Sequence, residues 1–344
     1  MSVMTTTPGR AITPRQRAMI EFALDNLVWF ILAIVLVVFS VTIPNFFQTG
    51  IFVNIVEQST FVGVMAIGLA IVVIAGHMDL SVESIAGLTA MITGILFCAR
   101  GIGLGLTLTP DWLIVPVSLF VALAVGAVIG TVNGYLVVRL RMNAFIVTLA
   151  AYIYVRGMVD AISGGRSAQD LAPALRVIGL PIEMLASIPG TALVAIVCFV
   201  IFTFILAKTP FGRHVIMIGG NPTAAFRAGI KADRLVLISF VIAGAIAGLA
   251  GWLLAIRTSG ATANLGVGML FRAFAAVVIG GVSLKGGIGQ LPGVYAGVLL
   301  LSAIQTAMNV MALPVQYTQM ILGALVLAAV LLDTVKLQIR QKLA

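Results

Sequence analysis

Charged residues are scarce in this 344-residue chain, and their scarcity excludes an ordinary soluble fold. They make up 9% of the residues, against about 25% in a typical soluble domain, while 61% of the residues are hydrophobic. Several apolar runs reach the length of about 20 residues that a helix needs to cross a bilayer. The composition therefore predicts an all-α integral membrane protein with many crossings.

Cysteine and histidine are also rare. The two cysteines, Cys98 and Cys198, both lie in apolar runs, where a free thiol usually behaves as a small buried hydrophobic group. The spacing of cysteine and histidine matches neither a disulfide framework nor a metal site. The sequence also lacks a Ser-His-Asp grouping and a flavin or nicotinamide fingerprint. We therefore expect no catalytic residues, no metal and no cofactor.

A phosphate-binding loop is missing as well. The chain contains no Gly-x-x-x-x-Gly-Lys-[Ser/Thr] segment, so it cannot hold ATP phosphates by the usual loop. If the protein drives transport, its energy must come from a separate partner or from an ion gradient.

The excess of basic residues has a topological explanation. Lys and Arg number 20 and Asp and Glu number 11, which gives a net charge of +9. With the N-terminus in the cytoplasm, most basic residues fall on the cytoplasmic side of the expected spans, as the positive-inside rule requires. This distribution predicts cytoplasmic termini and argues against a nucleic-acid partner. We expect ten spans, at residues 28–43, 54–76, 81–99, 113–137, 145–163, 191–207, 234–256, 267–283, 291–311 and 316–333.

The expected spans fall into two halves. A periplasmic loop at 164–190 separates a first repeat, 28–163, from a second, 191–335, with cytoplasmic tails at 1–27 and 336–344. Five spans in each half force opposite topologies, which is the inverted-repeat design of many transporters. The first apolar run lacks a small-residue cleavage site, so it is predicted to be an uncleaved anchor.

Glycine is abundant, and its spacing predicts close helix contacts. Small residues four apart let helix backbones approach each other within a membrane. The candidates are Gly126-xxx-Gly130-xxx-Gly134, Gly244-xxx-Gly248 and Gly293-xxx-Gly297.

Two glycine breaks resemble each other. The segment from Ile74 to Leu80 recurs loosely as Val278 to Leu284, which aligns Gly76 with Gly280. We interpret both as broken helices beside a central path, with chance similarity as the alternative. The span around 267–283 is too short to cross, so it is either a re-entrant wall of the path or a tilted helix with a glycine-rich connector. The candidate path residues are Gly76, His77, Asp79, Ser81, Glu83, Gly280, Gly281 and Ser283.

Several ionisable residues near the membrane have two interpretations. Asp79 caps the next helix or contacts the cargo, and Glu83 lines the path or faces an inner interface. Glu57 lies near the outer face, where a lipid headgroup or a functional partner would suit it. Arg156 and Asp160 are four residues apart, which predicts a mutual ion pair.

The longest cytoplasmic loop, 208–233, is predicted to contain a short helix. Asn221 is a good N-cap, Pro222 suits the first helical position, and Gly229 suits the C′ position. Such a short helix is marginal alone in water, so a protein surface should hold it. That surface belongs either to a docked partner or to the same chain.

Four motifs in order resemble a known family. They are Gly-x-x-Asp-Leu-Ser at 76–81, Phe-Ile-Val-Thr-Leu at 145–149 with Arg-Gly at 156–157, the Gly-Gly-Asn-Pro loop, and Gly-Gly-Val-Ser-Leu-Lys-Gly-Gly at 280–287. Together they resemble the ribose-type permeases, the membrane subunits of bacterial ABC importers for simple sugars, over about residues 28–335. His77 departs from the glycine that these permeases usually have, which leaves the fine substrate specificity open.

The resemblance implies partners and a location. It implies a bacterial inner-membrane permease that forms a homodimer or a related heterodimer, with a cytoplasmic ATPase subunit and a periplasmic sugar-binding protein. The residues that would couple to the ATPase are Asn221, Pro222, Thr223, Ala224, Ala225, Arg227 and Gly229. The residues that would dock the binding protein are Arg166, Asp170, Arg176 and Glu183.

An ion-coupled secondary transporter with inverted repeats is the alternative. Asp79, Glu83 or Glu57 would then bind a proton or sodium ion. The Gly-Gly-Asn-Pro helix favours the ABC permease. Which pentose, hexose or polyol is carried is not encoded in the permease, because the binding protein selects it.

Overall fold

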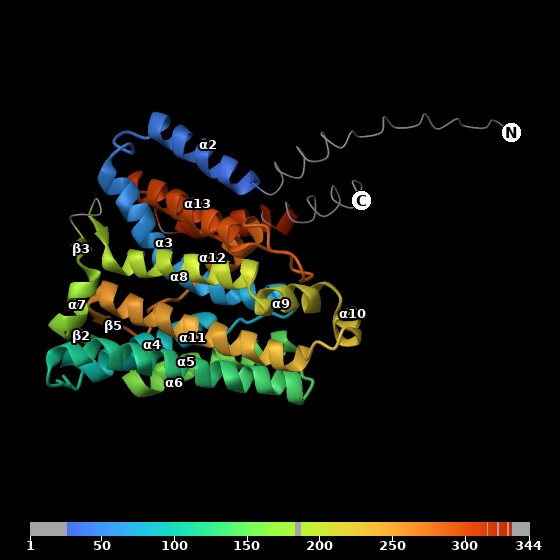
Figure 1. Ribbon diagram of the computed structural model, residues 1–344. Helices are drawn as coiled ribbons and strands as arrows, with labels where there is room; N and C mark the ends of the chain where they lie inside the picture. The colour runs from blue at the N-terminus through green and yellow to red at the C-terminus, as the bar shows by residue number, and fades with distance from the viewer. Residues whose placement is uncertain (1–25, 183–186, 315, 322, 329, 332–344) are drawn as a thin grey trace.

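A computed structural model describes residues 26–331 except 183–186, 315, 322 and 329 (Figure 1). Most of this part is helical, as the composition predicted. The main helices are α2 (Leu27–Thr42), α3 (Thr49–Ile74), α4 (Val82–Phe97), α5 (Ile114–Arg139), α6 (Ala144–Ser163), α8 (Gly190–Lys208), α9 (Pro210–Gly220), α10 (Pro222–Arg227), α11 (Ala232–Thr258), α12 (Met269–Ile279) and α13 (Leu291–Val310). A last helix covers Gln316–Ala328.

Six of the described helices are long and apolar enough to cross a membrane, namely α3, α5, α6, α8, α11 and α13. The helices α2, α4, α12 and Gln316–Ala328 are apolar but shorter. Each of the ten expected spans thus overlaps an apolar helix. At 1.5 Å per residue, the 11-residue helix α12 is about 16 Å long, well short of a bilayer core of about 30 Å.

The prediction of an all-α chain was incomplete, because short strands lie at one end of the molecule. The strands β1 (Cys98–Gly101), β2 (Ala168–Leu171) and β5 (Gly260–Ala261) form a small antiparallel sheet in the order β1-β2-β5. β3 (Pro181–Ile182) pairs with β4 (Ile188–Pro189). The short helices η1 (Asp111–Leu113), α7 (Pro173–Arg176) and η2 (Val177–Gly179) complete the connections. We call this region the strand end.

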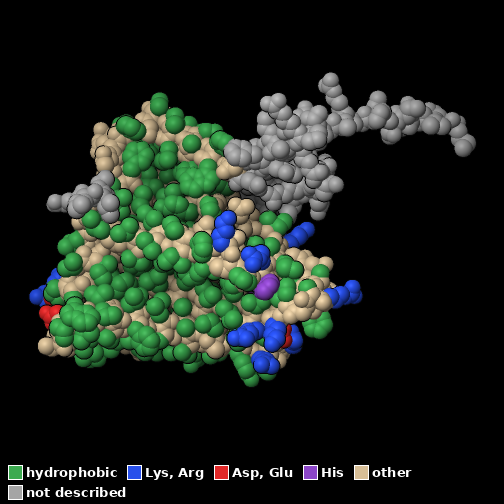
Figure 2. All heavy atoms as spheres, in the orientation of Figure 1, with side chains coloured by type: hydrophobic (Ala, Val, Ile, Leu, Met, Phe, Trp, Pro, Cys, Tyr) green, Lys and Arg blue, Asp and Glu red, His purple; other side chains and the backbone are tan. Residues whose placement is uncertain are grey.

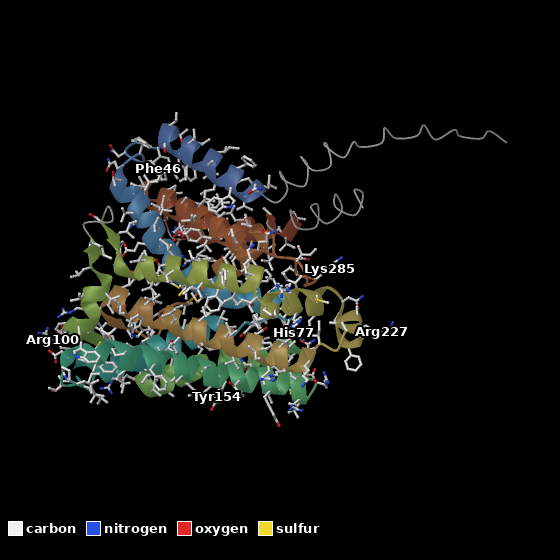
Figure 3. All side chains as sticks on the ribbon, viewed as in Figure 1. Phe46, His77, Arg100, Tyr154, Arg227 and Lys285 are labelled. Atoms are coloured by element: carbon white, nitrogen blue, oxygen red, sulfur yellow. The ribbon has the colours of Figure 1, made fainter. Side chains whose placement is uncertain are left out.

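The opposite end carries α9 and α10, and we call it the α10 end (Figure 1). Arg100 marks the strand end, whereas Arg227 and Lys285 mark the α10 end (Figure 3). Hydrophobic side chains cover the belt between the two ends, and Lys and Arg gather mainly at the α10 end (Figure 2). This is the surface of a protein that spans a bilayer.

Glycine allows the closest helix contacts, as its spacing predicted. A Cβ at Gly126 or Gly130 of α5 would overlap the backbone of α11, and a Cβ at Gly244 would overlap that of α5. The helices α13 and α12 touch in the same way, because a Cβ at Gly293 would overlap the carbonyl oxygen of Gly280.

Gly280, a predicted path residue, is packed as closely as Gly126, and its place on the path stays a prediction. A Cβ at Gly280 would lie 2.5 Å from the Cα of Val294 in α13, so both glycines serve backbone packing.

Candidate functional site

The two glycine breaks have the same backbone geometry. At the end of α3, the N–H of Gly76 donates to Val73 (2.9 Å) and the N–H of His77 donates to Val72 (3.0 Å). At the end of α12, Gly281 donates to Val278 (2.9 Å) and Val282 to Val277 (3.1 Å). Gly76 and Gly281 have φ values of +83° and +88°. Both are Schellman C-caps, whose left-handed residue is usually glycine.

This geometry corrects the sequence alignment by one residue. Gly76 is equivalent to Gly281, not to Gly280. The two helices also run in parallel: Gln58 and Val62 of α3 lie beside Arg272 near the start of α12, and Ile74 lies beside the loop that follows α12. Segments related by an inverted repeat run antiparallel to each other. The similarity between the ends of α3 and α12 therefore does not support an inverted repeat, which stays a prediction.

The two breaks meet at a junction made almost entirely of backbone. The N–H of Gly287 donates to the carbonyl of Ile74 at 2.9 Å. A Cβ at Gly219, near the end of α9, would overlap the same carbonyl, and a Cβ at Gly286 would lie 2.8 Å from the Cα of Gly76. We call Gly76, Gly219, Gly286 and Gly287 the glycine junction. It joins the ends of α3 and α9 to the loop after α12.

The segment 76–81 is held by hydrogen bonds to its neighbours, and its residues Asp79 and Ser81 are buried. Asp79 Oδ1 accepts hydrogen bonds from the backbone N–H (2.9 Å) and the hydroxyl (2.6 Å) of Ser81. Ser81 Oγ in turn accepts from Asn133 of α5 at 2.9 Å. The Thr148 hydroxyl of α6 also lies 3.3 Å from the Met78 carbonyl. Asp79 therefore stabilises the turn before α4 rather than capping the helix itself.

The predicted path residues of this segment do not form an open lining. Asp79 and Ser81 are 0% exposed, and the half-buried His77 has its ring 6.2 Å from that of Phe240. In the second break, Ser283 is buried and its hydroxyl accepts from the N–H of Lys285 at 3.3 Å.

Glu83 lies at the centre of a buried polar network. Its Oε2 accepts the N–H of Leu270, in the first turn of α12, at 2.8 Å. Its Oε1 lies 3.2 Å from the Arg156 guanidinium and accepts from the Tyr152 hydroxyl at 3.3 Å. Arg156 also donates to the carbonyls of Ala263 and Leu265, in the loop that leads to α12. One ion pair thus holds both the loop before α12 and the start of α12.

The predicted Arg156–Asp160 ion pair is therefore wrong. Asp160 is exposed, while Arg156 turns inward to a carboxylate that is 1% exposed. A buried charge is far more costly to leave unpaired than an exposed one, so the inward pairing is favoured. Glu57 likewise forms an ion pair with Arg257 of α11. Its partner is therefore a side chain of this protein and not the lipid headgroup that was one of the two expectations.

The α10 end confirms the predicted short helix. The Asn221 side chain accepts the N–H of Ala224 at 2.9 Å, Pro222 is the first helical residue, and Gly229 has a φ of +77°. The preceding helix α9, capped by Thr209, occupies much of the remaining loop and was not predicted.

Ala225, one of the predicted coupling residues, is buried within this chain and cannot contact a partner. Ala225 is 1% exposed and packs with Val72, Ile218 and Phe240, so it belongs to the core of this chain. Phe226, which the sequence analysis left out, is 76% exposed. An exposed phenylalanine on a helix outside the apolar belt is the signal that was missed.

Charged residues at the strand end form a surface cluster. Asp170 of β2 lies between Arg100 (3.7 Å) and Arg176 (3.5 Å), and Arg166 is exposed nearby in the sequence. Glu183 lies outside the described residues.

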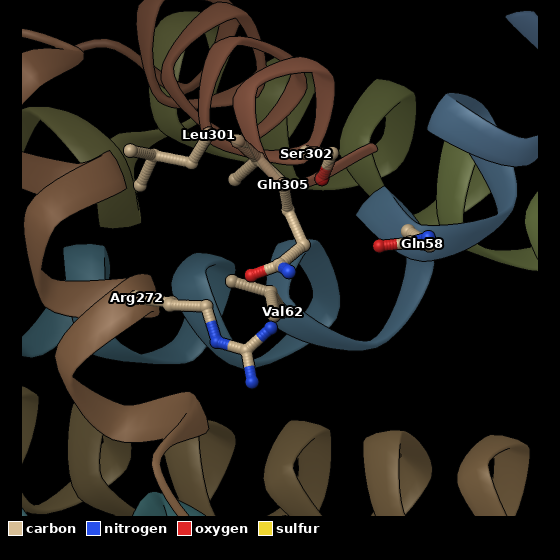
Figure 4. A pocket seen from close by; sticks show the side chains of 7 residues that line it. Gln58, Val62, Arg272, Leu301, Ser302 and Gln305 are labelled. Carbon is tan, nitrogen blue, oxygen red and sulfur yellow. The ribbon is translucent and has the colours of Figure 1, made fainter. Parts of the chain in front are cut away.

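A polar crevice between α3, α12 and α13 was not predicted (Figure 4). Arg272 and Gln305 point into it from α12 and α13, and Gln58 lies at its α3 side. The Nε of Arg272 is buried and has no hydrogen-bond partner among the described residues. Ser302 completes the polar lining, and Val62, Val298 and Leu301 supply its apolar part. Two glutamines and an arginine inside apolar spans were the available signal.

The glycine junction makes a prediction with an adjacent control. Gly219→Ala should destabilise the protein by about 1–3 kcal/mol, because its Cβ would overlap backbone that cannot move aside. Gly220→Ala should have little effect, since its Cβ would lie 3.7 Å from Gly287. Thermal unfolding of the purified variants in detergent measures this, and equal midpoints would contradict a rigid junction.

The Glu83 network makes a second prediction. Glu83→Ala should cost about 3–5 kcal/mol, because it leaves Arg156 buried without its carboxylate. Glu83→Gln should cost less, since the amide oxygen still accepts the N–H of Leu270. Asp233→Ala is the control: it breaks the exposed pair with Arg141 and should cost about 0–1 kcal/mol. Similar losses in Glu83→Ala and Asp233→Ala would refute the buried network.

Comparison with known proteins gives a consistent result. The chain is 33% identical to the L-arabinose ABC transporter permease protein AraH of Azospirillum brasilense, over 86% of this chain and 83% of that protein. It is 31% identical to the ribose import permease protein RbsC of Haemophilus influenzae, over 91% and 94% of the two chains. The xylose transport system permease protein XylH of the same organism is 28% identical, over 88% and 94%. No solved structure matches the chain.

A family model described as the permease component of branched-chain amino acid transport systems matches residues 51–330. The resemblance to ribose-type permeases is confirmed by the curated relatives. The chain belongs to this family of ABC transport permeases.

Proposed function

We propose that this chain is the permease subunit of a bacterial ABC importer, which moves a simple sugar or related polyol from the periplasm to the cytoplasm. The observation that carries the proposal is the match to arabinose, ribose and xylose permeases over most of each chain. The description of the family model names amino acids. We favour a sugar because each of these three relatives is named for a pentose.

The proposal includes an orientation. The α10 end would face the cytoplasm and the strand end the periplasm, with both termini cytoplasmic. The concentration of Lys and Arg at the α10 end supports this, by the positive-inside rule (Figure 2). We also propose about ten transmembrane helices in two inverted five-helix halves, 28–163 and 191–335, with the short α12 as a broken or re-entrant element that does not cross the membrane by itself.

Two of the three carboxylates considered for ion coupling, Glu57 and Glu83, argue against it. A secondary transporter would need a carboxylate free to bind a proton or sodium ion. Glu57 and Glu83 are each paired with an arginine. Asp79 accepts two hydrogen bonds from Ser81 on Oδ1, while its Oδ2 is buried without a partner among the described residues. A separate ATPase is the energy source that fits these pairings.

Partner surfaces follow from the orientation. The exposed side of α10, which includes Thr223, Ala224, Phe226 and Arg227, would seat the ATPase subunit. The cluster of Arg166, Asp170 and Arg176 would meet the sugar-binding protein. A second permease copy, identical or related, would complete the channel. The glycine junction would carry motion from α10 into the ends of α3 and α12.

Reconstitution tests the energy source. We expect proteoliposomes with the permease, its ATPase and its binding protein to accumulate a labelled pentose when ATP is supplied on the ATPase side. The chain alone should transport nothing under a proton or sodium gradient. Gradient-driven uptake by the purified chain would establish the secondary transporter instead.

Phe226→Asp tests the ATPase contact. This variant should lose most of the ATPase that copurifies with it, while its own thermal unfolding stays close to that of the wild type, because the side chain is exposed. Val177→Asp, at a 63% exposed position of the strand end, is the matched control and should retain the ATPase. Ala225→Asp is a poor test, since it would place a charge in the core. Full ATPase binding by Phe226→Asp would refute the contact.

A further inference from the structure

We propose that the crevice between α3, α12 and α13 is a sugar-contact site on the permeation path, and that Arg272 donates hydrogen bonds to the passing sugar. The inference rests on the proposed sugar permease function. Its three principal side chains are Gln58, Arg272 and Gln305, which come from three helices (Figure 4).

The polar lining is costly unless something polar meets it. Arg272 belongs to an apolar stretch, yet its Nε is buried and lacks a partner within the described part of the chain. A charged group inside a membrane usually faces a cavity or a functional partner. The Nε of Arg156 on α6 is also buried without a partner, but the terminal nitrogens of that side chain donate to Glu83 and to two carbonyls. Among the described residues, the Arg272 side chain has no such ion pair or hydrogen bond.

The donor and acceptor set suits a hydroxylated molecule. Gln58 and Gln305 each donate one amide N–H along their own helix, to Asn54 (2.8 Å) and Asn309 (3.1 Å). Their carbonyl oxygens remain able to accept, and the Arg272 guanidinium can only donate. Sugar hydroxyls both donate and accept, so they can satisfy both groups at once. The lining contains no carboxylate, which disfavours a cation.

The position of Arg272 is fixed at both ends of its helix. Glu83 accepts the N–H of Leu270, two residues before Arg272. At the other end, α12 terminates in the Gly281 cap, and the loop that follows enters the glycine junction with α9. Glu83 is therefore a positioning residue for Arg272. A shift of α9 would reach the crevice through 11 residues of helix.

The experiment compares transport with ATP hydrolysis in the reconstituted complex. We expect Arg272→Gln to lower pentose uptake about tenfold or more while binding-protein-stimulated ATPase activity stays within about twofold, because a hydrogen bond to a charged group is lost only in the path. Arg272→Lys keeps the charge and should recover part of the uptake. Arg139→Gln, at the exposed end of α5, is the control and should transport normally.

A second measurement detects contact directly. In a background without Cys98 and Cys198, Gln305→Cys should react with a small maleimide during turnover, and excess pentose with binding protein should slow the reaction at least threefold. Leu140→Cys, at a 57% exposed position in the loop between α5 and α6, should react at a rate that sugar does not change.

The outcomes distinguish a failure of the crevice site from a failure of the proposed permease function. Normal uptake by Arg272→Gln, or a Gln305→Cys reaction that sugar does not slow, would overturn the crevice site. Loss of both uptake and ATPase activity with aggregation of Arg272→Gln would mean a structural arginine, and would also overturn it. Failure of the wild-type complex to import any sugar with ATP would instead overturn the proposed function.

Discussion

The rest of this structure depends on how helix ends inside an apolar bundle satisfy their backbone groups. A helix that starts or stops away from water leaves N–H and C=O groups that need protein partners. The helix α12 meets this constraint twice in 11 residues. Glu83 accepts an N–H at its start, and a glycine-centred Schellman cap satisfies the carbonyls at its end. Because Glu83 is needed at the start of α12, its buried charge requires the ion pair with Arg156. Because α12 ends in a glycine cap, the loop that follows can enter the glycine junction.

Close backbone approach then organises the bundle. Between α5 and α11, glycines replace side chains along the contact, so the helices pack backbone against backbone. At the glycine junction, direct backbone contact at glycines joins three chain segments rather than two helices. Where backbones are in direct contact, few side chains lie between them that could change rotamer to accommodate a movement. A displacement at one segment is therefore passed to the others instead of being absorbed.

Local signals in the sequence predicted much of the fold. Apolar runs located the helices, and Asn221, Pro222 and Gly229 bounded α10 correctly because capping depends on adjacent residues. The partner of Arg156 could not be predicted in this way. Asp160 is four residues away and looked suitable, whereas Glu83 is distant in sequence and is brought close only by the packing of α4 and α6.

The candidate site was predicted less well for the same reason. Gln58, Arg272 and Gln305 are isolated polar residues on three separate helices, and only the tertiary fold makes them one crevice. The inward face of α10 was also hidden, because the six-residue helix buries the small Ala225 and exposes the large Phe226. Hydrophobicity alone would have predicted the reverse.

The meeting of helix ends at the glycine junction has an electrostatic consequence. The helices α3, α9 and α12 all point their C-termini toward it, and each C-terminus carries a partial charge of roughly −0.5. The loop that closes the junction carries Lys285 and no acidic residue between Gly280 and Gln290. A carboxylate in this loop would be repelled by all three helices. The junction therefore favours a cationic side chain in this loop, which gives the position of Lys285 an electrostatic cause within the protein.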